Sequence, residues 1–525
     1  MSKLEIEISS LLLKEHFGDI VQKVGTVLLR KRQLPLGVIG KECGLKIDQV
    51  KKGLCSLIQH NMVTFELHKR GFVEYEIRTG VPLLLLRYPR YIYASKTLYG
   101  DAAELIIEEI LHHGQINMSS VVDKVTNRLN EAMKVQKEAA ISKDDVVSKF
   151  KALAETQFIK RCPEMSDSNE NDSAIPKMEI DTERMYKVPR LNDAQIKSER
   201  ENSSSQSNER KRKIPKDRSK SPEPPDAGIY WHLNFQRFHT LFRDQELISA
   251  VANKLDKEAS EVLRSMLRID VSDPASPVSQ PLSSHEIYHQ FPKNIKLTKQ
   301  AMDQYLTLLT EDSTGFVRRV GDMGGGTYVI DYKDALKNLA VAHIECVVRE
   351  RFGSKSLRIF RLLLMKKQLE QKQIEEFALI PAKEAKEMLY KMFEEDFVTV
   401  TEVSKTADHA PSRTFYLFSV NITQVSRKLL DQSFQALCRL IQRREYETKE
   451  HRRLLDKQQK VEAISASLTG ADEEQRAEIE DTITPPEREQ IDKVKNMTKK
   501  LEMSELQVDE TIFILQMYLL YAKTT

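Results

Sequence analysis

An amphipathic helix that leads directly into two short strands occurs four times in this chain. The helices carry apolar residues at three- and four-residue spacing, and the strands are rich in β-branched and aromatic residues, as in VTFEL and FVEYEI. The copies occupy residues 46–77, 142–162 with a return strand at 185–189, 299–332 and 382–420. A helix followed by a β-hairpin is the ending of a winged-helix domain. The repeat therefore predicts a mainly α protein with small β wings, in which four winged-helix domains form a tandem array.

Changes in composition along the chain mark the predicted domain boundaries. Residues 164–228 are rich in Ser, Asn, Asp, Glu, Lys, Arg and Pro and contain almost no aromatic residues, which is typical of a disordered segment. We interpret them as an insert after the first strand of the second wing, acidic at its start and basic further on. The predicted parts are winged helix 1 at 1–82, winged helix 2 at 83–163, the insert at 164–228, winged helix 3 at 229–332, winged helix 4 at 333–420 and a helical C-terminal region at 421–525.

The C-terminal region shows helical periodicity and no strand signal. Nine positions between residues 491 and 519 are spaced alternately by three and four, and seven of them are apolar, with Thr498 and Glu505 as the two interruptions. A second apolar stripe runs from Leu430 to Leu468. We therefore predict a coiled coil in which the chain folds back on itself as an intramolecular helical hairpin. An intermolecular zipper is the alternative.

The overall charge and hydropathy exclude several broad classes of protein. The 525 residues carry a formal net charge of only +3, so nucleic-acid binding has to come from local basic patches. The first residues lack the basic and apolar regions of a signal peptide, and VPLLLLRYP is too short to span a bilayer, so we predict no membrane association. The five cysteines contain no CxxC pair, which favours a reducing intracellular compartment.

Segments that resemble catalytic or metal-binding motifs have simpler explanations. The sequence GDMGGGTY at 321–328 lacks the Gly-Lys-Ser/Thr ending of a phosphate-binding loop and lies between two predicted strands, so we interpret it as a wing turn. His112 and His113 lie near a helix end, where they act as cations or caps, and no second Cys or His cluster accompanies them. We predict no catalytic residue, no metal site and no cofactor.

Two of the four repeats carry basic residues where a winged helix can contact DNA phosphates. The first has lysines on its third helix and a basic wing tip, and the third has basic residues near its third helix and at the start of its wing. The candidate DNA-contacting residues are Lys51, Lys52, His68, Lys69, Arg70, Lys296, Lys299, Arg318 and Arg319. A solvated polar face is the alternative at each cluster. The third helices of the second and fourth repeats mix Lys with Asp or Glu, which favours protein docking over base recognition.

The insert contains two candidate signals. The run Arg210-Lys211-Arg212-Lys213 is typical of a nuclear-localisation signal, and a merely solubilising basic run is the alternative. Ser221 precedes Pro222 and is a candidate phosphorylation site. The basic run predicts a nuclear location for the protein.

Four longer stretches resemble a known family. They are FRDQELISAVANKLD at 242–256, IPAKEAKEMLYKMFEEDF at 380–397, DHAPSRTFYLFSVN at 408–421 and LRYPRYIYASKTLYGD at 86–101. These stretches are similar to the large winged-helix subunits of RNA polymerase III, which are related to the alpha subunit of TFIIE. The resemblance covers essentially the whole chain apart from 164–228. It implies four extended winged-helix domains and a C-terminal coiled coil.

The resemblance also implies a set of partners. Members of this family belong to a heterotrimer specific to polymerase III, and the catalytic magnesium site lies on other subunits of the enzyme. We therefore expect a non-catalytic subunit of a nucleotidyltransferase complex. The implied partners are the other polymerase subunits, especially the two other heterotrimer members, the promoter-bound initiation factor TFIIIB, and single- or double-stranded DNA bound without sequence preference.

The implied role is in transcription initiation in the nucleus. It comprises recruitment to the initiation factor, promoter opening and stabilisation of the open complex, for small non-coding RNAs such as tRNA and 5S rRNA. Cytosolic sensing of foreign DNA is attributed to the whole animal polymerase, which adds the cytosol as a second expected location. The alternative is a pure protein-docking scaffold without direct DNA contact.

Overall fold

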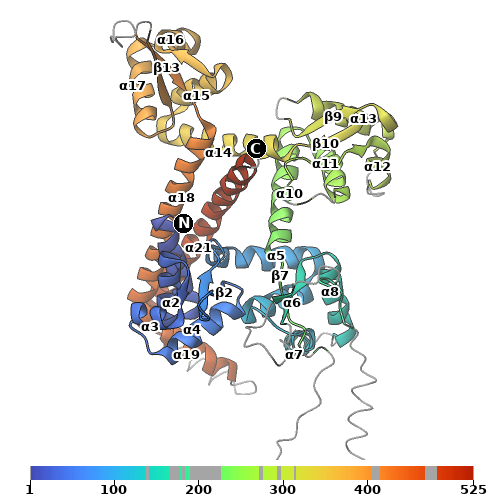
Figure 1. Cartoon of the computed structure of the whole chain (residues 1–525), viewed down its shortest axis with the longest axis vertical. Helices are drawn as coiled ribbons and strands as arrows, with labels where there is room; N and C mark the ends of the chain where they lie inside the picture. Colours follow the sequence, from blue (N-terminus) through green and yellow to red (C-terminus); the bar gives the residue numbers. More distant parts are fainter. Residues whose placement is uncertain are drawn as a thin grey trace, which may run out of the picture. The chain divides into compact units, whose positions relative to one another are not determined.

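The computed structural model describes residues 2–136, 141–165, 178–179, 184–189, 226, 228–270, 273, 276–291, 297–312, 315–404, 414–467 and 482–523. Within these residues the chain is mainly helical, and small antiparallel sheets accompany the helices (Figure 1). The structure divides into two units, Met1–His239 and Thr240–Thr525, and each unit has its own core. The predicted fold class, mainly α with small β wings, is confirmed.

The first winged helix begins with two helices that pack against each other and ends in a three-stranded sheet. Its elements are α1 (Lys3–Phe17), α2 (Asp19–Lys31), β1 (Leu34–Pro35), α3 (Leu36–Cys43), α4 (Ile47–Gln59), β2 (Val63–Leu67) and β3 (Val73–Ile77). The strand order is β1-β3-β2, and Val63 lies opposite Ile77 at the base of the wing. The apolar face of α4 is buried through Val50, Leu54 and Leu57, as its helical spacing predicts.

In the second winged helix a longer helix takes the place of the short α3 of the first, and the sheet is smaller. Its elements are η1 (Pro82–Arg87), α5 (Tyr88–Tyr99), α6 (Asp101–His113), α7 (Met118–Gln136), α8 (Lys143–Glu155), β4 (Ile159–Arg161) and β7 (Trp231–Leu233), with a separate pair β5 (Glu164–Met165) and β6 (Met178–Glu179). Strand β7 pairs antiparallel with β4 and also forms a bridge to Ile116, which precedes α7. This sheet completes the domain.

The return strand of the second wing is β7, not the predicted segment 185–189. Those residues form a turn and irregular backbone rather than a strand. The carbonyl of Met185 accepts a hydrogen bond from the N–H of Arg161 at 3.0 Å, and the carbonyl of Lys187 accepts one from the Arg161 side chain. The physical reason is Trp231, which is fully buried and packs edge-on against Phe150 with ring centroids 5.3 Å apart. Burial of so large a ring outweighs anything that MYKVP offers to the core. Residues 231–233 therefore belong to the second winged helix rather than the third.

Unit 2 contains the third winged helix. Helix α10 (Phe235–Lys254) leads into it along the chain. The elements that follow are α11 (Lys257–Ile269), β8 (Leu282–Ser283), α12 (Ser284–His289), α13 (Lys299–Glu311), β9 (Val317–Gly321), η2 (Met323–Gly325) and β10 (Thr327–Ile330). The strand order is β8-β10-β9, and a register shift interrupts the wing between Thr327 and Tyr328. The predicted wing turn at 321–328 is thus a turn between two paired strands.

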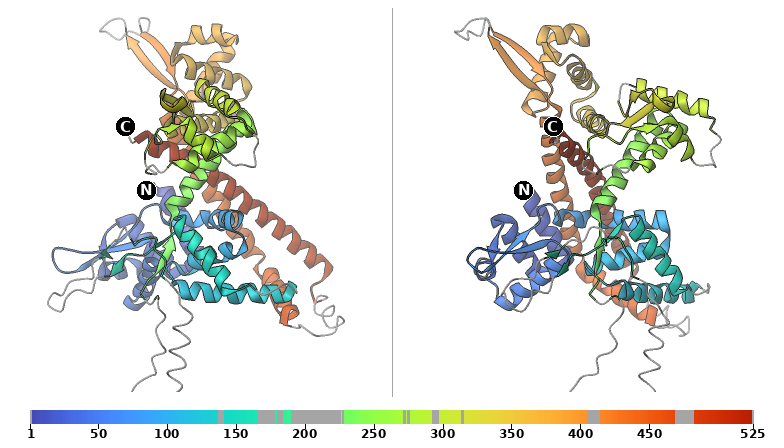
Figure 2. Two further views of the ribbon diagram at one scale, coloured as in Figure 1. Left: turned by 90° about the vertical axis from the view of Figure 1, so that its right-hand side faces the viewer. Right: turned by 45° about the vertical axis from the view of Figure 1, so that its right-hand side comes forward.

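The fourth winged helix has the longest wing of the described parts (orange in Figure 2). Its elements are α14 (Tyr332–Phe352), α15 (Ser354–Lys366), β11 (Gln368–Glu370), α16 (Gln371–Ala378), α17 (Ala382–Glu394), β12 (Thr399–Ser404) and β13 (Thr414–Ser419). The strand order is β11-β13-β12, with Thr399 opposite Ser419 and Ser404 opposite Thr414. The predicted hairpin at the end of this repeat is therefore present.

All four domains share one topology. A very short strand after the first two helices pairs with the return strand of the wing, which gives β1-β3, Ile116-β7, β8-β10 and β11-β13. The return strand is therefore central in each sheet, and the first wing strand lies at one edge. The short strands were not predicted, because one to three residues are too few to show a period of two.

The C-terminal region is an intramolecular helical hairpin, as preferred from the sequence. It comprises α18 (Ile422–Glu450), α19 (Arg452–Ser467) and α21 (Pro485–Lys523), and α18 packs along α21 (Figure 1). Glu505, one of the two interruptions in the apolar seam, is buried and accepts two hydrogen bonds from Arg444, at 2.9 and 3.2 Å. A paired charge at a seam position fixes the register of two helices, because sliding would leave both charges buried and unpaired.

A buried arginine joins three helices within unit 2. Arg243 of α10 is 4% exposed and donates a hydrogen bond to the hydroxyl of Tyr521 in α21, at 2.8 Å. Its guanidinium lies 3.8 Å from the ring centroid of Tyr332, the first residue of α14. The hydroxyl of Tyr332 donates in turn to Asp270 at 2.6 Å, and burial strongly raises the pKa of this tyrosine. An ion pair with Asp244 at 2.8 Å, the cation–π contact and the hydrogen bond to Tyr521 together keep the buried charge satisfied.

Candidate nucleic-acid interface

The tip of the first wing is a compact basic turn. The N–H of His68 donates to the carbonyl of Phe72 at 2.8 Å, and the N–H of Gly71 donates to the carbonyl of His68 at 2.9 Å. The His68 ring stacks on Phe72 with centroids 4.5 Å apart. Gly71 has φ +84°, a left-handed conformation that favours glycine. This turn leaves Lys69 and Arg70 exposed at its end.

The helix that precedes this wing, α4, exposes two further cations. Lys51 and Lys52 of α4 point away from the core, since Val50 and Leu54 on the other face are buried. Among the described residues, neither these two lysines nor the two cations at the wing tip form an ion pair. Free ammonium and guanidinium groups on a third helix and a wing can hold phosphates without reading sequence.

The stem of the first wing is acidic, a feature that the basic residues at its tip do not reveal. Glu66 and Glu74 lie directly opposite each other on β2 and β3. Glu76 accepts a hydrogen bond from the side chain of Gln33 at 2.9 Å. Like charges opposite each other disfavour the pair and repel a phosphate backbone. The cationic surface of this wing is therefore confined to its tip.

The third domain presents its predicted cluster differently. Arg318 forms an ion pair with Asp331 at 2.8 Å, and Arg319 forms one with Asp322 at 2.8 Å. Both arginines are thus engaged with carboxylates of their own wing. Lys299 is exposed at the start of α13, whereas Lys296 lies outside the described residues. The structure leaves this cluster with less available charge than the sequence suggests.

The tip of the third wing carries apolar side chains, a feature that the glycine-rich sequence conceals. Met323 is 84% exposed and Val320 is 65% exposed. Gly326 has φ +113°, and a Cβ there would lie 2.8 Å from the hydroxyl of Tyr328, so the turn requires glycine. The wing turn predicted at 321–328 is therefore a tight turn that displays a methionine.

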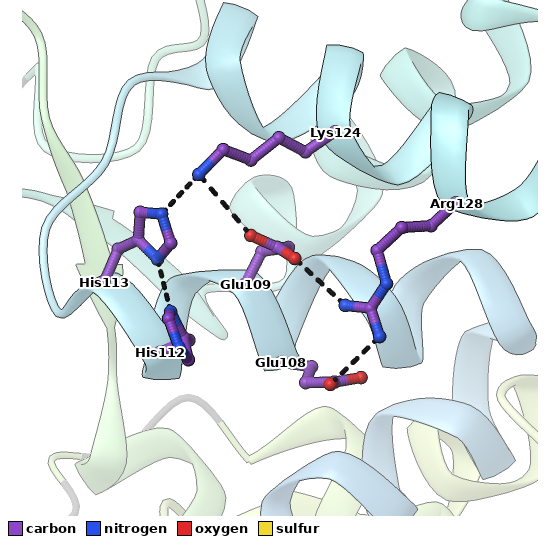
Figure 3. A network of polar contacts seen from close by, with 6 residues as sticks. All are labelled: Glu108, Glu109, His112, His113, Lys124 and Arg128. Atoms are coloured by element: carbon purple, nitrogen blue, oxygen red, sulfur yellow. Dashed lines mark hydrogen bonds and ion pairs between the residues drawn. The ribbon is translucent and has the colours of Figure 1, made fainter. Parts of the chain in front are cut away.

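A polar network fastens α6 to α7 in the second domain (Figure 3). Glu109, largely buried, forms an ion pair with Arg128 at 2.9 Å, and Arg128 also reaches Glu108 at 3.2 Å. Lys124 lies 3.8 Å from Glu109 and contacts the ring of His113. Burial, followed by the charge of Lys124, lowers the pKa of His113, so the neutral ring accepts from the ammonium group.

The two histidines predicted at the end of α6 belong to this network. The Nδ1 atoms of His112 and His113 lie 2.8 Å apart, so one ring donates to the other (Figure 3). In the part of the chain that the structure describes, no group of three His, Cys, Asp or Glu residues is placed to hold a metal ion. Nor is any described helix long and apolar enough to cross a bilayer.

The candidate signals of the insert fall outside the described residues. This applies to the basic run from Arg210 to Lys213 and to Ser221. Both stay predictions from the sequence.

The fold and the basic first wing define a multidomain winged-helix protein with a C-terminal helical hairpin, a class found in transcription complexes. Four family models match it in chain order. They are the RNA polymerase III subunit RPC82 helix-turn-helix domain at 7–68, RNA polymerase III subunit RPC82 at 142–339, the POLR3C C-terminal winged-helix domain at 344–420 and the DNA-directed RNA polymerase III subunit RPC3 helical hairpin domain at 453–514. The chain belongs to the RPC3 family of DNA-directed RNA polymerase III subunits.

The similarity to relatives extends over the full length. RPC3 of Homo sapiens is 50% identical over 529 residues, which cover 99% of each chain. RPC3 of Danio rerio is 47% identical over 535 residues, again with 99% of each chain covered. The protein from Dictyostelium discoideum is 20% identical over 641 residues, covering 89% of this chain and 94% of its own. The family expected from the sequence resemblance is confirmed.

Proposed function

We propose that this chain is a non-catalytic subunit of nuclear RNA polymerase III that acts in initiation. The observation that carries the proposal is the similarity to RPC3 subunits over 99% of the chain, at 50% identity in the human case. Its partners are the other polymerase subunits, in particular the two other members of a heterotrimer, and the initiation factor TFIIIB. Its role is recruitment, promoter opening and open-complex stabilisation on genes for small RNAs such as tRNA and 5S rRNA.

Within this role, the first winged helix makes weak, sequence-independent contacts to DNA. The cations at the wing tip and on α4 are exposed and lack ion-pair partners among the described residues, which supports phosphate contact. Contacts that bind the opened promoter better than the closed duplex would shift the equilibrium between them towards the open form. This mechanism needs only a small difference in affinity and no catalytic group on this chain.

Protein docking without DNA contact is the second candidate function, and a specific observation favours it for two domains. On α8, Lys143 pairs with Asp123 at 2.7 Å, and on α17, Glu384 pairs with Lys355 at 2.6 Å. These helices, which precede the wings, therefore offer a surface of mixed charge, with acids and lysines side by side. Such a surface suits a protein partner better than a base edge.

The cellular location follows the role. We place the chain in the nucleus, with the basic run from Arg210 to Lys213 as the import signal. Cytosolic DNA sensing by the whole enzyme would add a second location. Fusing the run to a reporter protein and imaging the fusion tests the import signal, and a cytosolic reporter would contradict it.

Two measurements test the proposed function. A tagged full-length chain should co-purify with polymerase III subunits, and its absence from the enzyme would reject the role. The purified full chain should bind single- and double-stranded DNA with an affinity that falls steeply as salt rises, because each phosphate contact releases counterions. Undetectable binding at low salt would leave the docking scaffold as the better account.

A further inference from the structure

Helices α15 and α16 pack against each other in the fourth winged helix (Figure 1). Three large apolar side chains near the ends of these two helices are exposed. Leu379 is 85% exposed, Met365 is 76% exposed and Phe377 is 54% exposed. Single exposed apolar residues are ordinary, but a cluster of large ones on a folded domain marks an interaction site.

Contacts between the two helices bring these side chains to one face. Arg358 of α15 donates a hydrogen bond to the carbonyl of Ala378 at the end of α16, at 3.2 Å. Two turns further along α15, the ammonium group of Lys366 lies 5.9 Å from the ring centroid of Phe377. Met365 is seven residues from Arg358 and therefore shares its helix face.

The backbone at Leu379 strengthens the argument. Leu379 caps α16 in the left-handed region, with φ 52° and ψ 49°. The first winged helix has Gly44 at the same place after α3, with φ 63° and ψ 27°. In both domains the next residue donates its N–H to the carbonyl five residues earlier, at 3.3 Å. Glycine suits this cap, so an exposed leucine there stabilises the free domain through neither its backbone nor its burial.

The rim of this face is cationic. Arg358, Lys366 and Lys367 are exposed, and within the described residues none of them forms an ion pair. Two acids lie on α16, Glu375 and Glu376, against three cations on the rim, and Glu375 also accepts a hydrogen bond from Gln371 at 2.8 Å. The local balance therefore favours a partner of negative charge.

We propose that the Leu379 face, formed by Met365, Phe377 and Leu379 with a cationic rim, docks an acidic segment of another polymerase subunit that carries two or more large apolar side chains. The apolar side chains of the segment cover the centre of the face, and its carboxylates pair with the rim. An apolar centre distinguishes this surface from a phosphate-binding one. The identity of the partner as a polymerase subunit rests on the proposed function.

Photocrosslinking in the assembled enzyme tests the proposal. p-Benzoylphenylalanine replaces Leu379 in the tagged full chain, the polymerase is purified and irradiated, and the adduct is located by mass spectrometry. We expect an adduct to a segment of another subunit with net negative charge and at least two large apolar residues. An adduct to DNA, to a second copy, to this chain itself or to a neutral or basic segment overturns the proposal, as does the absence of an adduct.

Variants separate docking from a structural role. L379G should lower the amount of the crosslinked subunit retained at 0.3 M salt by about tenfold, which corresponds to about 1.4 kcal/mol. The thermal midpoint of the isolated chain should stay the same or rise, since glycine suits the left-handed cap. A lowered midpoint with unchanged retention would show that Leu379 is structural. V403A, at a residue 46% exposed on β12 of the same domain, is the matched control and should change neither readout.

The two proposals fail in different ways. A chain that does not co-purify with the polymerase contradicts the proposed function and, with it, the choice of partner. A chain that co-purifies but gives no adduct to an acidic segment contradicts the docking face alone. Charge reversal in K366E together with K367E should weaken retention, and unchanged retention would contradict the cationic rim.

Discussion

The first and third wings share a strand topology and differ in what they present at the tip. The first displays Lys69 and Arg70, which have no ion-pair partner among the described residues. The third pairs its arginines with Asp331 and Asp322 and displays Met323 instead. Two domains of the same architecture thus offer a tip with unpaired cations and an apolar tip. Function lies in the residues placed on the fold, not in the winged helix itself.

The difference also teaches why a basic pair in a sequence is not yet a basic surface. Arg318 and Arg319 lie on β9, and their partner carboxylates come from Asp331, which follows β10, and Asp322, which begins the turn. In the first wing, the acids lie on the stem and leave the tip free. Strand register and turn geometry decide which cations remain unpaired and available to a ligand.

The largest expected effect is a loss of folding stability at acid pH. Unit 1, which carries the first wing, should lose more than unit 2, which carries the third. Burial lowers the pKa of His60 to about 4, of His232 to about 4 and of His239 to about 3, all in unit 1. These rings are neutral when folded and titrate near 6.5 when unfolded, so their contribution is complete above pH 6.5 and is lost as the pH falls towards 4. Between pH 6.5 and pH 5 each ring loses about 1.5 pKa units of stabilisation, so the three together lose roughly 6 kcal/mol, at about 1.4 kcal/mol per pKa unit.

Hydrogen exchange followed by mass spectrometry at pH 7.5 and pH 5 checks this expectation for each unit separately. Unit 1 should lose protection first, since it contains three such histidines. In the described part of unit 2, burial lowers the pKa of one histidine, His343. H60Q should retain more protection at pH 5 than the parent chain, and H68Q at the wing tip is the control. Equal loss in both units would contradict the assignment.

The next effect is on DNA binding and compares the wings directly. K69E with R70E should weaken DNA binding by about 10- to 100-fold at low salt and flatten the salt dependence by about two, since about one unit of slope is lost per cation. R318E with R319E should cost less than about threefold, because these arginines are already paired. Fluorescence anisotropy over a salt series measures both. Equal losses would erase the distinction between the wings.

A smaller effect is expected on stability, and here the third wing should be more sensitive to substitution than the first. Arg318 pairs with Asp331, which is largely buried and also caps α14 by accepting the N–H of Asp334 at 3.0 Å. R318A should therefore destabilise the third winged helix by about 1 kcal/mol, since the carboxylate loses its partner while the arginine is half exposed. R70A should stay within about 0.5 kcal/mol of the parent chain. Denaturant titration monitored by hydrogen exchange tests both variants, with β9 and β10 as the reporters for R318A and β2 and β3 as the reporters for R70A.

The smallest effect is expected at the apolar tip of the third wing. M323S should change DNA affinity by less than about twofold, because the methionine offers no charge to a phosphate. The same anisotropy assay applies. A loss of tenfold or more would show that this tip inserts between base steps, as apolar wedges do in other DNA-binding proteins, and that the third wing is a DNA contact after all.

Periodicity and composition predicted the repeated helix and hairpin, the C-terminal hairpin and the class of fold. These predictions rested on the long amphipathic helices, since α4 and α21 bury the faces that their spacing indicates. Sequence reasoning failed at the second wing, where two strands that pair are far apart in the chain. It also missed the short first strands, which are too brief to show a pattern. Long-range pairing depends on core packing around Trp231, which local pattern does not reveal.

The site was predictable only in part. The basic tip at 68–70 follows from residue type and its place between two strands. The pairing of Arg318, the acidic stem and the exposed Leu379 do not, because each depends on which side chains meet in space. The buried pair of Glu505 and Arg444 shows the same limit, since in the sequence Glu505 is only an interruption of the seam.

Strand β7 is synthesised well after its partner β4, which affects how the second domain folds on the ribosome. The central strand of the second sheet follows its partner β4 by about seventy residues, so the second domain stays incomplete until well after its helices have left the ribosome. The third and fourth domains have no such gap between their wing strands. Because β7 contains the single tryptophan of the chain, and that ring is fully buried, its fluorescence reports when this one domain closes. Cleavage between β4 and β7 would then leave two fragments joined by strand pairing, with the tryptophan signal intact.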